Sequence, residues 1–407
     1  MKKFDIPLHY RSQIIARIKN ARKLNDPRKK DFSSTRLDFG KVQFLIPRHF
    51  GFCYGVENAI EIAYKTIEEN PDKKIFLLSE MIHNPAVNKD LNSRGIKFLM
   101  DTSGKNIIPW EELNSDDIII IPAFGTTLEI ERKLNELGID PYRYNTTCPF
   151  VEKVWNRSAQ LGQGEYTIII HGKHTHEETR ATFSHAIKSA PALIVRDIKE
   201  TQFLADFISG EKSTDDFLEY FKYKISSGFD PVKDLERVGV VNQTTMLASE
   251  TEEIAKNIKD TMLKKFGAEN INQHFADTRD TLCYATNDNQ EATYGVLKED
   301  ADLAIVVGGY NSSNTSHIVE LCEKELPTYF ISSELNLISE NVINHFDIHS
   351  KTEVVTEKYL PPKQPVKIII TSGASCPDAV VDSVIKRLLE FYNYSGEMEP
   401  ILKKAIS

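Results

Sequence analysis

The sequence contains no run of about 20 apolar residues, the length that a membrane-spanning helix needs. It contains neither a P-loop nor the GxGxxG fingerprint of dinucleotide-binding folds, so any electrons that the protein uses must come from another protein or a diffusible donor. An excess of positive charge is also lacking: acidic residues outnumber basic ones, and the net charge of −9 argues against a dominant basic face for a duplex nucleic acid. We therefore expect a protein that binds neither membranes nor nucleic acid.

Cysteine is sparse and irregularly spaced. The five cysteines form no CxxC pair, and an odd number does not suit a secreted disulfide framework: Cys53, Cys148, Cys283, Cys322 and Cys376. This pattern favours a reducing compartment such as the cytoplasm, and it weakens a zinc-ribbon interpretation. A metal bound by these residues must be gathered by the fold rather than by one loop.

The first 30 residues carry ten Lys or Arg against Asp5 and Asp26, although the whole chain is acidic. Such an arm is either a solvated helix face or a docking patch for an acidic partner. It contains one serine, Ser12, and no long apolar core, so we do not expect a secretory or transit peptide. We expect a cytoplasmic location if the source is bacterial, and the plastid stroma if it is a plant or an alga.

One order of elements occurs three times: a cysteine opens an amphipathic helix, and a short apolar strand then ends in a polar turn. Cysteine and turn residue lie 30, 28 and 29 positions apart in the pairs Cys53 and His83, Cys148 and His176, and Cys283 and Ser312. A second strand and turn follow at 116–127, 237–246 and 366–378, and each leads into a helical pattern. Alternating helices and buried strands predict an α/β fold with parallel sheets.

The repeat predicts three similar small α/β domains. We expect a basic N-terminal extension at 1–42, followed by domains at 43–144, 145–264 and 265–407, the last with the C-terminal tail. Residues 200–236 break the symmetry of the second domain and are either a surface insertion or a lid over the site. In open α/β sheets ligands gather at the carboxyl ends of the strands, so three cysteines and six polar turns would meet if the domains share an axis.

Three thiolates at one point suit a soft metal centre, either zinc or an iron–sulfur cluster. A four-iron cluster with three protein ligands keeps one iron open as a Lewis acid, which favours catalysis over electron transfer alone. The alternative is that each cysteine is a small buried hydrophobic residue. We expect that role for Cys322, at helical spacing in HIVELCEKEL, whereas Cys376 lies beside Ser375 in a predicted turn without being a ligand.

The polar turns suit an anionic substrate. The turn 311–314 precedes a helix predicted to begin near Thr315, so hydroxyls, amides and backbone N–H groups can face a phosphate, with the helix dipole behind them. The turn 373–375 is similar. His83 and His176 are either charge-assisted donors to the same anion or structural residues.

Glu178 follows His176 on the same turn. A carboxyl group in a dry site can hold a proton near neutral pH and deliver it, although a first-turn acid of a helix is an equally physical role. The hydroxyls of Thr244 and Thr245 either orient substrate or cap a helix. His171, His174 and His185 have no counterpart in the repeat and are predicted to be structural.

Eight short segments of the sequence together form a pattern that is typical of one protein family. They occur in order between residues 43 and 392: GFCYGV, HNPAVNKDL, TTCPFVEKV, THEET, NQTT, CYATNDNQEA, NSSNTSHI and TSGASCPD. With them the chain resembles the 4-hydroxy-3-methylbut-2-enyl diphosphate reductase (LytB) family, which catalyses the last step of the methylerythritol phosphate route to isoprenoids. The combination is highly specific and covers most of the chain.

The resemblance implies a pseudo-threefold trefoil of α/β domains around a central 4Fe–4S cluster with one open iron, which oxygen damage would convert to 3Fe–4S. The implied ligands are Cys53, Cys148 and Cys283, and the implied diphosphate contacts are His83, His176, Ser312, Ser313, Asn314 and Ser375. Thr244 would lie near the substrate hydroxyl, and Glu178 with His176 would take part in catalysis. A ferredoxin or flavodoxin type electron donor is the implied partner.

Two features depart from the common family pattern. Many members have a histidine where this chain has Phe124, and we expect Phe124 to pack against the substrate carbon chain or a neighbouring domain. The N-terminal arm and the 200–236 insertion resemble the longer branch of the family, known from plastids, cyanobacteria and some other bacteria. The residues alone leave two other functions open: an iron–sulfur hydro-lyase without net redox chemistry, and a metal-stabilised redox-sensing protein.

Overall fold

The structure is a computed structural model that describes residues 4–276, 278 and 281–406. By its internal contacts the chain divides into two compact units. Unit 1 comprises Met1–Glu57, His83–Asn88 and Tyr284–Ser407, and unit 2 comprises Asn58–Ile82 and Lys89–Cys283. The division into three domains stays a prediction.

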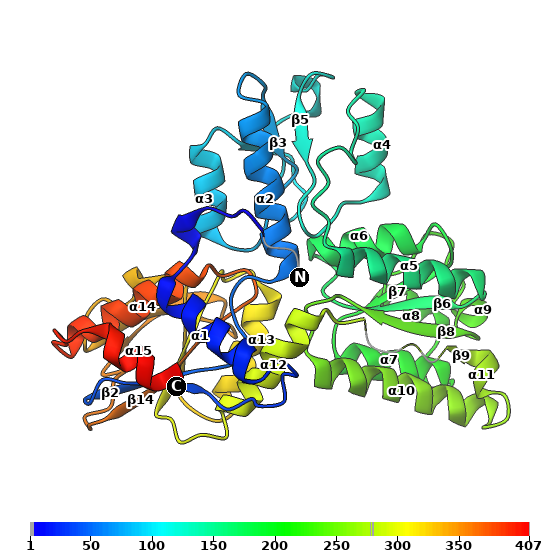
Figure 1. Cartoon of the computed structure of the whole chain (residues 1–407). Coiled ribbons are helices and arrows are strands. Elements are labelled where there is room, and N and C mark those ends of the chain that lie inside the picture. The colour runs from blue at the N-terminus through cyan, green and yellow to red at the C-terminus, as the bar shows by residue number, and fades with distance from the viewer. Residues whose placement is uncertain (1–3, 277, 279–280, 407) are drawn as a thin grey trace. The chain divides into compact units, whose positions relative to one another are not determined.

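Three β-sheets among the described residues repeat one strand order (Figure 1). In each, the two strands predicted for one repeat lie side by side and parallel, and a third parallel strand flanks the first of them. In unit 2 these orders are β4 (Lys97–Phe98), β3 (Ile75–Leu77), β5 (Ile118–Ile120), and β7 (Ala192–Val195), β6 (Thr167–His171), β8 (Val238–Asn242), with β9 (Phe275–Ala276) beyond β8. The predicted α/β class is confirmed.

The sheet around β6 is covered on both faces (Figure 1). Val154 and Leu161 of α5 (Pro149–Gln163) pack with alternate residues of β6 on the face that also carries α6 (Glu177–Ala186). The opposite face packs against α7 (Ile198–Ile208) and α10 (Ala248–Phe266). Strands buried on both faces read as continuous apolar runs, which explains the sequence pattern.

The segment 200–236 is more than a surface insertion. It belongs to the connection from β7 to β8 and contains most of α7, then α8 (Thr214–Tyr220) and α9 (Pro231–Asp234). Leu204, Phe217 and Phe221 are fully buried in the core of this sheet. The interpretation as a surface insertion therefore needs correction, because much of the segment supplies hydrophobic core.

The other sheet of unit 2 packs Leu99, Ile119 and Ile121 against Leu134 of α4 (Leu128–Glu136). Helices α2 (Tyr54–Glu69) and α3 (Pro85–Ser93) lie on its other side in Figure 1. A short helix, η2 (Trp110–Glu112), lies between β4 and β5, and α11 (Ile271–His274) precedes β9.

Unit 1 contains a seven-stranded sheet. Its order is β1 (Thr35–Asp38), β2 (Val42–Ile46), β14 (Val366–Ser372), β10 (Leu303–Val307), β11 (Thr328–Ile331), β12 (Val342–Asp347), β13 (Thr352–Glu357). One face packs against α1 (Gln13–Asn25), α14 (Asp378–Phe391) and α15 (Met398–Ile406), and the other against α12 (Tyr284–Val296) and α13 (Ser313–Glu323). Two short helices, η1 (Leu8–Tyr10) and η3 (Glu334–Asn336), complete the unit as described.

The N-terminal arm is part of unit 1 and not a free basic tail. Helix α1 buries Ile14, Ile15 and Ile18 against the sheet core. Its cations pair with acids far along the chain, as in Arg17 with Glu399 (2.5 Å) and Lys19 with Asp378 (2.6 Å). Neither sequence interpretation of the arm was complete, because a solvated helix face and a docking patch both leave out its packed apolar side.

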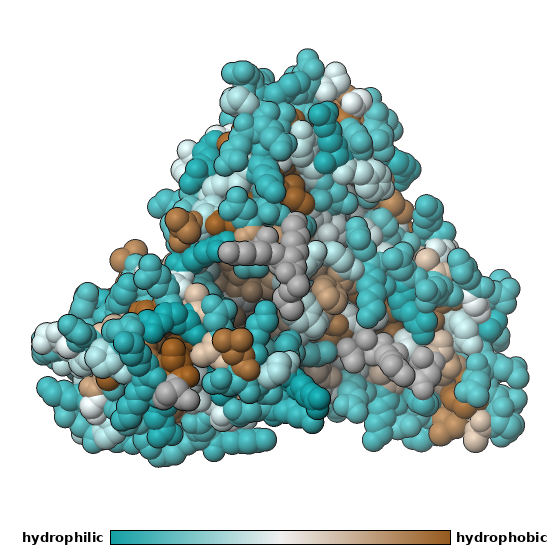
Figure 2. Space-filling view, in the orientation of Figure 1, coloured by the Kyte–Doolittle hydropathy of each residue, from teal (hydrophilic) through white to brown (hydrophobic). Residues whose placement is uncertain are grey.

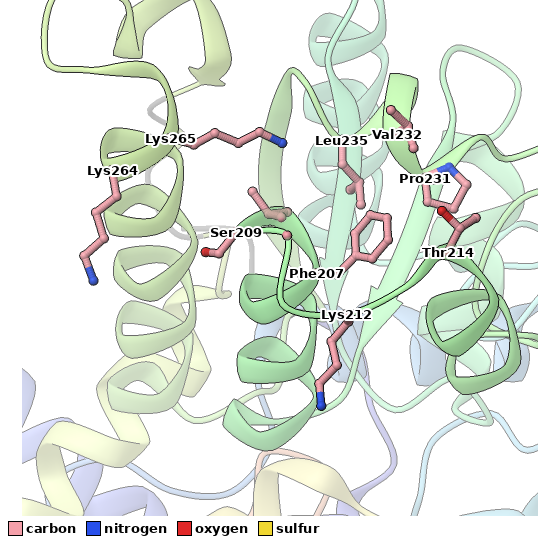
Figure 3. A pocket seen from close by; sticks show the side chains of 11 residues that line it. Phe207, Ser209, Lys212, Thr214, Pro231, Val232, Leu235, Lys264 and Lys265 are labelled. Carbon is pink, nitrogen blue, oxygen red and sulfur yellow. The ribbon is translucent and has the colours of Figure 1, made fainter.

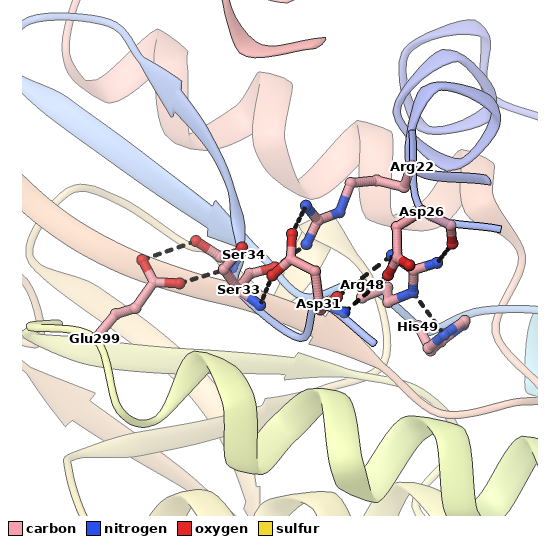
Figure 4. A network of polar contacts seen from close by, with 8 residues as sticks. All are labelled: Arg22, Asp26, Asp31, Ser33, Ser34, Arg48, His49 and Glu299. Carbon is pink, nitrogen blue, oxygen red and sulfur yellow. Dashed lines mark hydrogen bonds and ion pairs between the residues drawn. The ribbon is translucent and has the colours of Figure 1, made fainter. Parts of the chain in front are cut away.

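The buried side chain of Arg48 binds the N-terminal arm at Asp26 (Figure 4). The Arg48 side chain is 3% exposed, and its guanidinium donates to the Asp26 carbonyl (2.6 Å) and lies 3.0 Å from the Asp26 carboxylate. Further along, the Ser34 N–H and hydroxyl both donate to the Glu299 carboxylate (2.6 and 2.9 Å). Burial lowers the pKa of His49, next to Arg48, to about 4.

None of the described helices is long and apolar enough to cross a membrane. The face in Figure 2 is mostly hydrophilic, with hydrophobic side chains in small separate groups. Scattered exposed apolar residues such as Tyr223 and Leu335 are ordinary for a protein surface.

Candidate functional site

The three cysteines of the repeat occupy one structural position. Each directly precedes the first residue of a helix: Cys53 precedes α2, Cys148 precedes α5 and Cys283 precedes α12. None of the three forms a disulfide with a described residue, and all three are partly exposed, whereas Cys322 and Cys376 are fully buried in apolar clusters. The prediction that Cys322 belongs to the core is confirmed, and Cys376 is likewise buried.

The backbone of each of these cysteines is held in the same way. Its N–H donates to the carbonyl of a turn residue that follows the second strand of another repeat. The donor–acceptor pairs are Cys148 with Ala123 (2.9 Å), Cys283 with Thr244 (3.1 Å) and Cys53 with Ala374 (3.3 Å). In each case the carbonyl belongs to a residue two or three positions after the strand end, which is Ile120, Asn242 or Ser372. The repeat therefore extends to the hydrogen bonds that place its cysteines.

Cys148 and Cys283 belong to unit 2, and Cys53 belongs to unit 1. No group of three His, Cys, Asp or Glu side chains that could hold a metal ion occurs within the described part of the chain. Burial, with smaller contributions from the Cys283 thiol and the Glu178 carboxyl, raises the pKa of Cys148 to about 12. The meeting of all three thiols at one cluster stays a prediction.

Unit 1 brings five of the six predicted diphosphate contacts together. Ser312 is the N-cap of α13, and its Oγ accepts the Thr315 N–H (3.3 Å). The Ser375 hydroxyl donates to the His83 carbonyl (3.1 Å) and lies 3.4 Å from Ser312 Oγ. Ser313 is the first residue of the same helix. The backbone N–H groups and the helix dipole at this end favour an anion.

Asn314, the second residue of α13, faces the same turn. Its Oδ1 accepts the Ala374 N–H (2.8 Å) and the Asn289 side-chain amide (3.3 Å). Its Nδ2 is buried and makes no hydrogen bond with any described residue. A buried amide donor without a partner is costly, so this atom fits a ligand oxygen.

Close backbone packing shapes this turn. A Cβ on Gly309 would lie 2.3 Å from the His83 carbonyl oxygen, and a Cβ on Gly373 would lie 1.9 Å from Thr315 Oγ1. Both distances are too short for any side chain. Glycine at these positions lets the two turns and the start of α13 approach each other.

In unit 2, the turn before α6 places His176, Glu178 and Thr244 together. His176 is the N-cap of α6, and its Nδ1 accepts the Glu178 N–H (3.2 Å). Glu178 is 1% exposed, and its Oε1 accepts the Thr244 N–H (2.5 Å). Glu178 is therefore a first-turn acid of the helix and also a partner of the turn that holds Cys283.

Several neighbouring residues have structural contacts. Thr245 Oγ1 accepts the Gln243 side-chain amide (2.7 Å), and neither Thr244 nor Thr245 caps α10, whose N-cap is Leu247. Buried His171 contacts Thr251 Oγ1 (3.0 Å) through Nδ1. The helix-capping alternative for the two threonines is therefore wrong.

Phe124 packs within unit 2 against a predicted site residue. Its ring meets the His176 imidazole edge-to-face with centroids 5.6 Å apart. A pocket of about 370 Å³ lies beside them and is lined in part by Gly125, Glu177 and Arg180. Whether Phe124 also contacts a substrate stays a prediction.

A pocket of about 550 Å³ elsewhere in unit 2 contains none of the predicted site residues (Figure 3). Phe207 and Leu235 form its apolar floor, and Lys265 extends toward it, whereas Lys264 and Lys212 point away. It lies at the C-terminal ends of α7 and α10, while the candidate site residues lie at helix starts.

Sequence reasoning missed three features of the site. The N-cap of α3 is Asn84, whose Oδ1 accepts the Ala86 and Val87 N–H groups, so His83 lies one position before the true counterpart of His176 and Ser312. Asn289 and the turn carbonyls were also missed. Asn289 lies within CYATNDNQEA, but its contact with Asn314 depends on packing between α12 and α13.

The chain is similar in sequence to a known protein family. The family model described as LytB protein matches residues 44–389. The chain belongs to the LytB family. Relatives named 4-hydroxy-3-methylbut-2-enyl diphosphate reductase include one from Prochlorococcus marinus subsp. pastoris, 43% identical and covering 86% of each chain. Another, from a Cyanothece species, is 39% identical over 90% of this chain and 89% of the relative.

Solved structures of LytB-type reductases have a similar fold. The E-1-hydroxy-2-methyl-but-2-enyl-4-diphosphate reductase of Plasmodium falciparum gives a TM-score of 0.62 at 20% identity, covering 90% of this chain and 98% of that one. A structure titled as (E)-4-hydroxy-3-methyl-but-2-enyl diphosphate reductase, the terminal enzyme of the non-mevalonate pathway, gives 0.51 at 24% identity, covering 85% and 99%. At these identities the likeness establishes the fold.

Proposed function

We propose that this protein is an iron–sulfur oxidoreductase that converts 4-hydroxy-3-methylbut-2-enyl diphosphate into isopentenyl diphosphate and dimethylallyl diphosphate. Membership in the LytB family and the reductase names of relatives that cover most of the chain support this activity. The structural observation that carries the proposal is the threefold recurrence of one cysteine environment, at a helix start and with the backbone held by a turn carbonyl.

The cysteines fit an iron–sulfur cluster as ligands. Thiolates are the preferred donors for such clusters, and partial exposure leaves Cys53, Cys148 and Cys283 accessible to a metal centre. When bound, a 4Fe–4S cluster with three cysteine ligands would pass electrons from the donor to the substrate and would supply one open iron as a Lewis acid. In this proposal the three repeats form a trefoil around the cluster.

The residues of unit 1 would bind the diphosphate. Ser312 and Ser313 present hydroxyls at the start of α13, where the helix dipole favours negative charge. The buried Asn314 Nδ2 would donate to a phosphate oxygen, and the Ser375 hydroxyl lies next to Ser312. His83 would add a further contact, and together these groups would hold the substrate in one orientation.

The residues of unit 2 would deliver protons to the substrate and orient its hydroxyl group. Removal of the substrate hydroxyl as water takes up two electrons and two protons. Glu178 is almost fully buried, and its Oε1 accepts the Thr244 N–H; we assign proton delivery to its carboxyl group. His176 would bind the diphosphate and help to hold Glu178, whose N–H its Nδ1 accepts, while the Thr244 hydroxyl would orient the substrate hydroxyl.

The protein carries no recognisable nucleotide-cofactor motif, so a ferredoxin or flavodoxin type protein is the proposed electron donor. The relatives described above are cyanobacterial, which supports a cytoplasmic location in a bacterium as the expectation for this chain.

The test is anaerobic reconstitution with iron and sulfide, followed by metal analysis, electron paramagnetic resonance and turnover with a chemically reduced mediator. We expect about four irons and four acid-labile sulfides per chain. Substrate should change the spectrum, and both products should form only with reductant. In E178Q the cluster should load normally while turnover falls on the order of 100-fold or more.

Other outcomes would overturn the proposal. Turnover without reductant would identify a hydro-lyase, which uses an open iron without net electron transfer. Bound zinc without sulfide would identify a metal-stabilised protein instead. A spectrum that does not respond to the substrate would remove the reductase assignment even if a cluster is present.

A further inference from the structure

Two polar side chains at equivalent positions of the repeat accept hydrogen bonds from turn residues. The carbonyls of the same turn residues accept the N–H groups of two of the cysteines. Glu178 and Asn314 are each the second residue of the helix that follows the first strand of a repeat. Glu178 Oε1 accepts the Thr244 N–H (2.5 Å), and Asn314 Oδ1 accepts the Ala374 N–H (2.8 Å). Thr244 and Ala374 are the residues whose carbonyls accept the cysteine N–H groups.

The result is one short chain of hydrogen bonds in each unit. In unit 2 it runs from the Glu178 carboxylate through Thr244 to the Cys283 N–H. In unit 1 it runs from the Asn314 amide oxygen through Ala374 to the Cys53 N–H. A side chain that fixes the N–H of a turn residue restricts its backbone dihedrals, and therefore the direction of its carbonyl.

The first repeat of the chain lacks such a side chain and supplies an internal control. The second residue of α3 is Ala86, which has no side-chain acceptor. The Ala123 N–H donates to the Met81 carbonyl instead (3.3 Å), and the Ala123 carbonyl accepts the Cys148 N–H. The corresponding chain of hydrogen bonds to Cys148 therefore runs through main-chain atoms.

We propose that Glu178 and Asn314 are positioning residues that fix the backbones of Cys283 and Cys53 through the turn residues Thr244 and Ala374. Glu178 then has two separable tasks, since its Oε1 holds the turn and its carboxyl group is also the proposed proton donor. Asn314 likewise has two, since Oδ1 holds the turn while Nδ2 remains for the substrate. The assignment of the bound group as an iron–sulfur cluster rests on the proposed function, whereas the hydrogen-bond chains do not depend on it.

Glutamine and alanine at position 178 separate the tasks. E178Q keeps an acceptor oxygen for the Thr244 N–H and removes the titratable carboxyl, whereas E178A removes both. N314D keeps an oxygen for the Ala374 N–H, whereas N314A does not. We therefore expect each conservative variant to rescue the positioning defect of its alanine counterpart.

The experiment uses the full-length loaded protein and follows two signals. The first is the rate at which a ferrous chelator removes iron under anaerobic conditions. The second is amide hydrogen exchange, by mass spectrometry, of the peptides that contain Cys53, Cys148 and Cys283. Loss of the acceptor for the Thr244 N–H should speed iron release in E178A about tenfold or more, whereas E178Q keeps an acceptor oxygen and should match the parent protein.

Amide hydrogen exchange should show which cysteine backbone each substitution loosens. E178A should accelerate exchange in the Cys283 peptide and leave the other two unchanged, and N314A should do the same for the Cys53 peptide. Equal behaviour of E178A and E178Q, or faster exchange of all three peptides together, would overturn the positioning role. If the bound metal proves to be zinc, the proposed function fails, while exchange and metal release still decide this inference.

Discussion

Replacing Gly373 with alanine tests how closely the proposed diphosphate site is packed. A Cβ at Gly373 would lie 1.9 Å from Thr315 Oγ1 and 3.0 Å from Thr315 Cβ. Non-bonded heavy atoms need about 3.5 Å, so the turn or the start of α13 must move by roughly 1.5 Å if Thr315 keeps its rotamer. Ser375 lies on the same turn, two residues after Gly373, and would move with it.

The expected losses of stability and of activity follow from this displacement. Overpacking of a tight contact costs about 1–3 kcal/mol of unfolding free energy, which chemical denaturation measures as a lower midpoint. A shift of about 1 Å in positioning groups can cost on the order of 100-fold in rate. We expect kcat/KM of the loaded G373A enzyme to fall roughly 10- to 100-fold, mainly through a higher KM, because the diphosphate contacts separate.

A double-mutant cycle identifies the clash. T315A removes Oγ1, so adding it to G373A should recover part of both losses, although T315A alone loses the 3.0 Å bond to Ser312 Oγ. Gly162→Ala is the matched control, since its Cβ would lie 2.6 Å from Ser189 Cβ at the far end of α5. It should lower stability and leave KM unchanged. Strictly additive effects of G373A and T315A would refute the reasoning.

Three further changes probe the arm and the Phe124 contact. R48M should lower the unfolding free energy by roughly 1.5–3 kcal/mol and expose the arm to proteases, because the 2.6 Å bond to the Asp26 carbonyl is lost; an unchanged cleavage pattern would contradict this. Burial lowers the pKa of His49 to about 4, so the stability from its neutral ring is complete above pH 6.5 and falls as the pH drops toward 4. Denaturation at pH 7.5 and 5 should differ by about 1–2 kcal/mol after allowance for partial exposure, and by less in H49Q; equal differences would count against this origin. F124H should weaken or leave unchanged the substrate affinity measured by calorimetry, because the Phe124 ring packs on His176, and a marked gain would mean that a missing contact had been restored.

Much of the fold could be predicted because its signals are local. The apolar runs of β3, β6 and β10 are short and bounded by turn residues, and each is followed by a helix start. Their pairing with β5, β8 and β14 followed from the order of elements in each repeat. The cysteine positions repeat because each occupies the same place before a helix.

Contacts between distant segments were not predictable in the same way. The cations of α1 gave only a basic run, and their pairing with Glu399 and Asp378 depends on how the arm packs on the last helices. The core role of Phe217 and Phe221 within 200–236 was hidden for the same reason, because burial is a property of the folded neighbourhood rather than of the local sequence.

The sequence by itself determined the α/β order of elements, the cysteine repeat and the family of this protein, because these depend on spacing along the chain. The tertiary structure decided which atoms meet. It made Asn314 the counterpart of Glu178 and placed each of them on the turn that holds a cysteine. Residues far apart in sequence become hydrogen-bond partners only once the sheets have formed, so spacing alone could not reveal them.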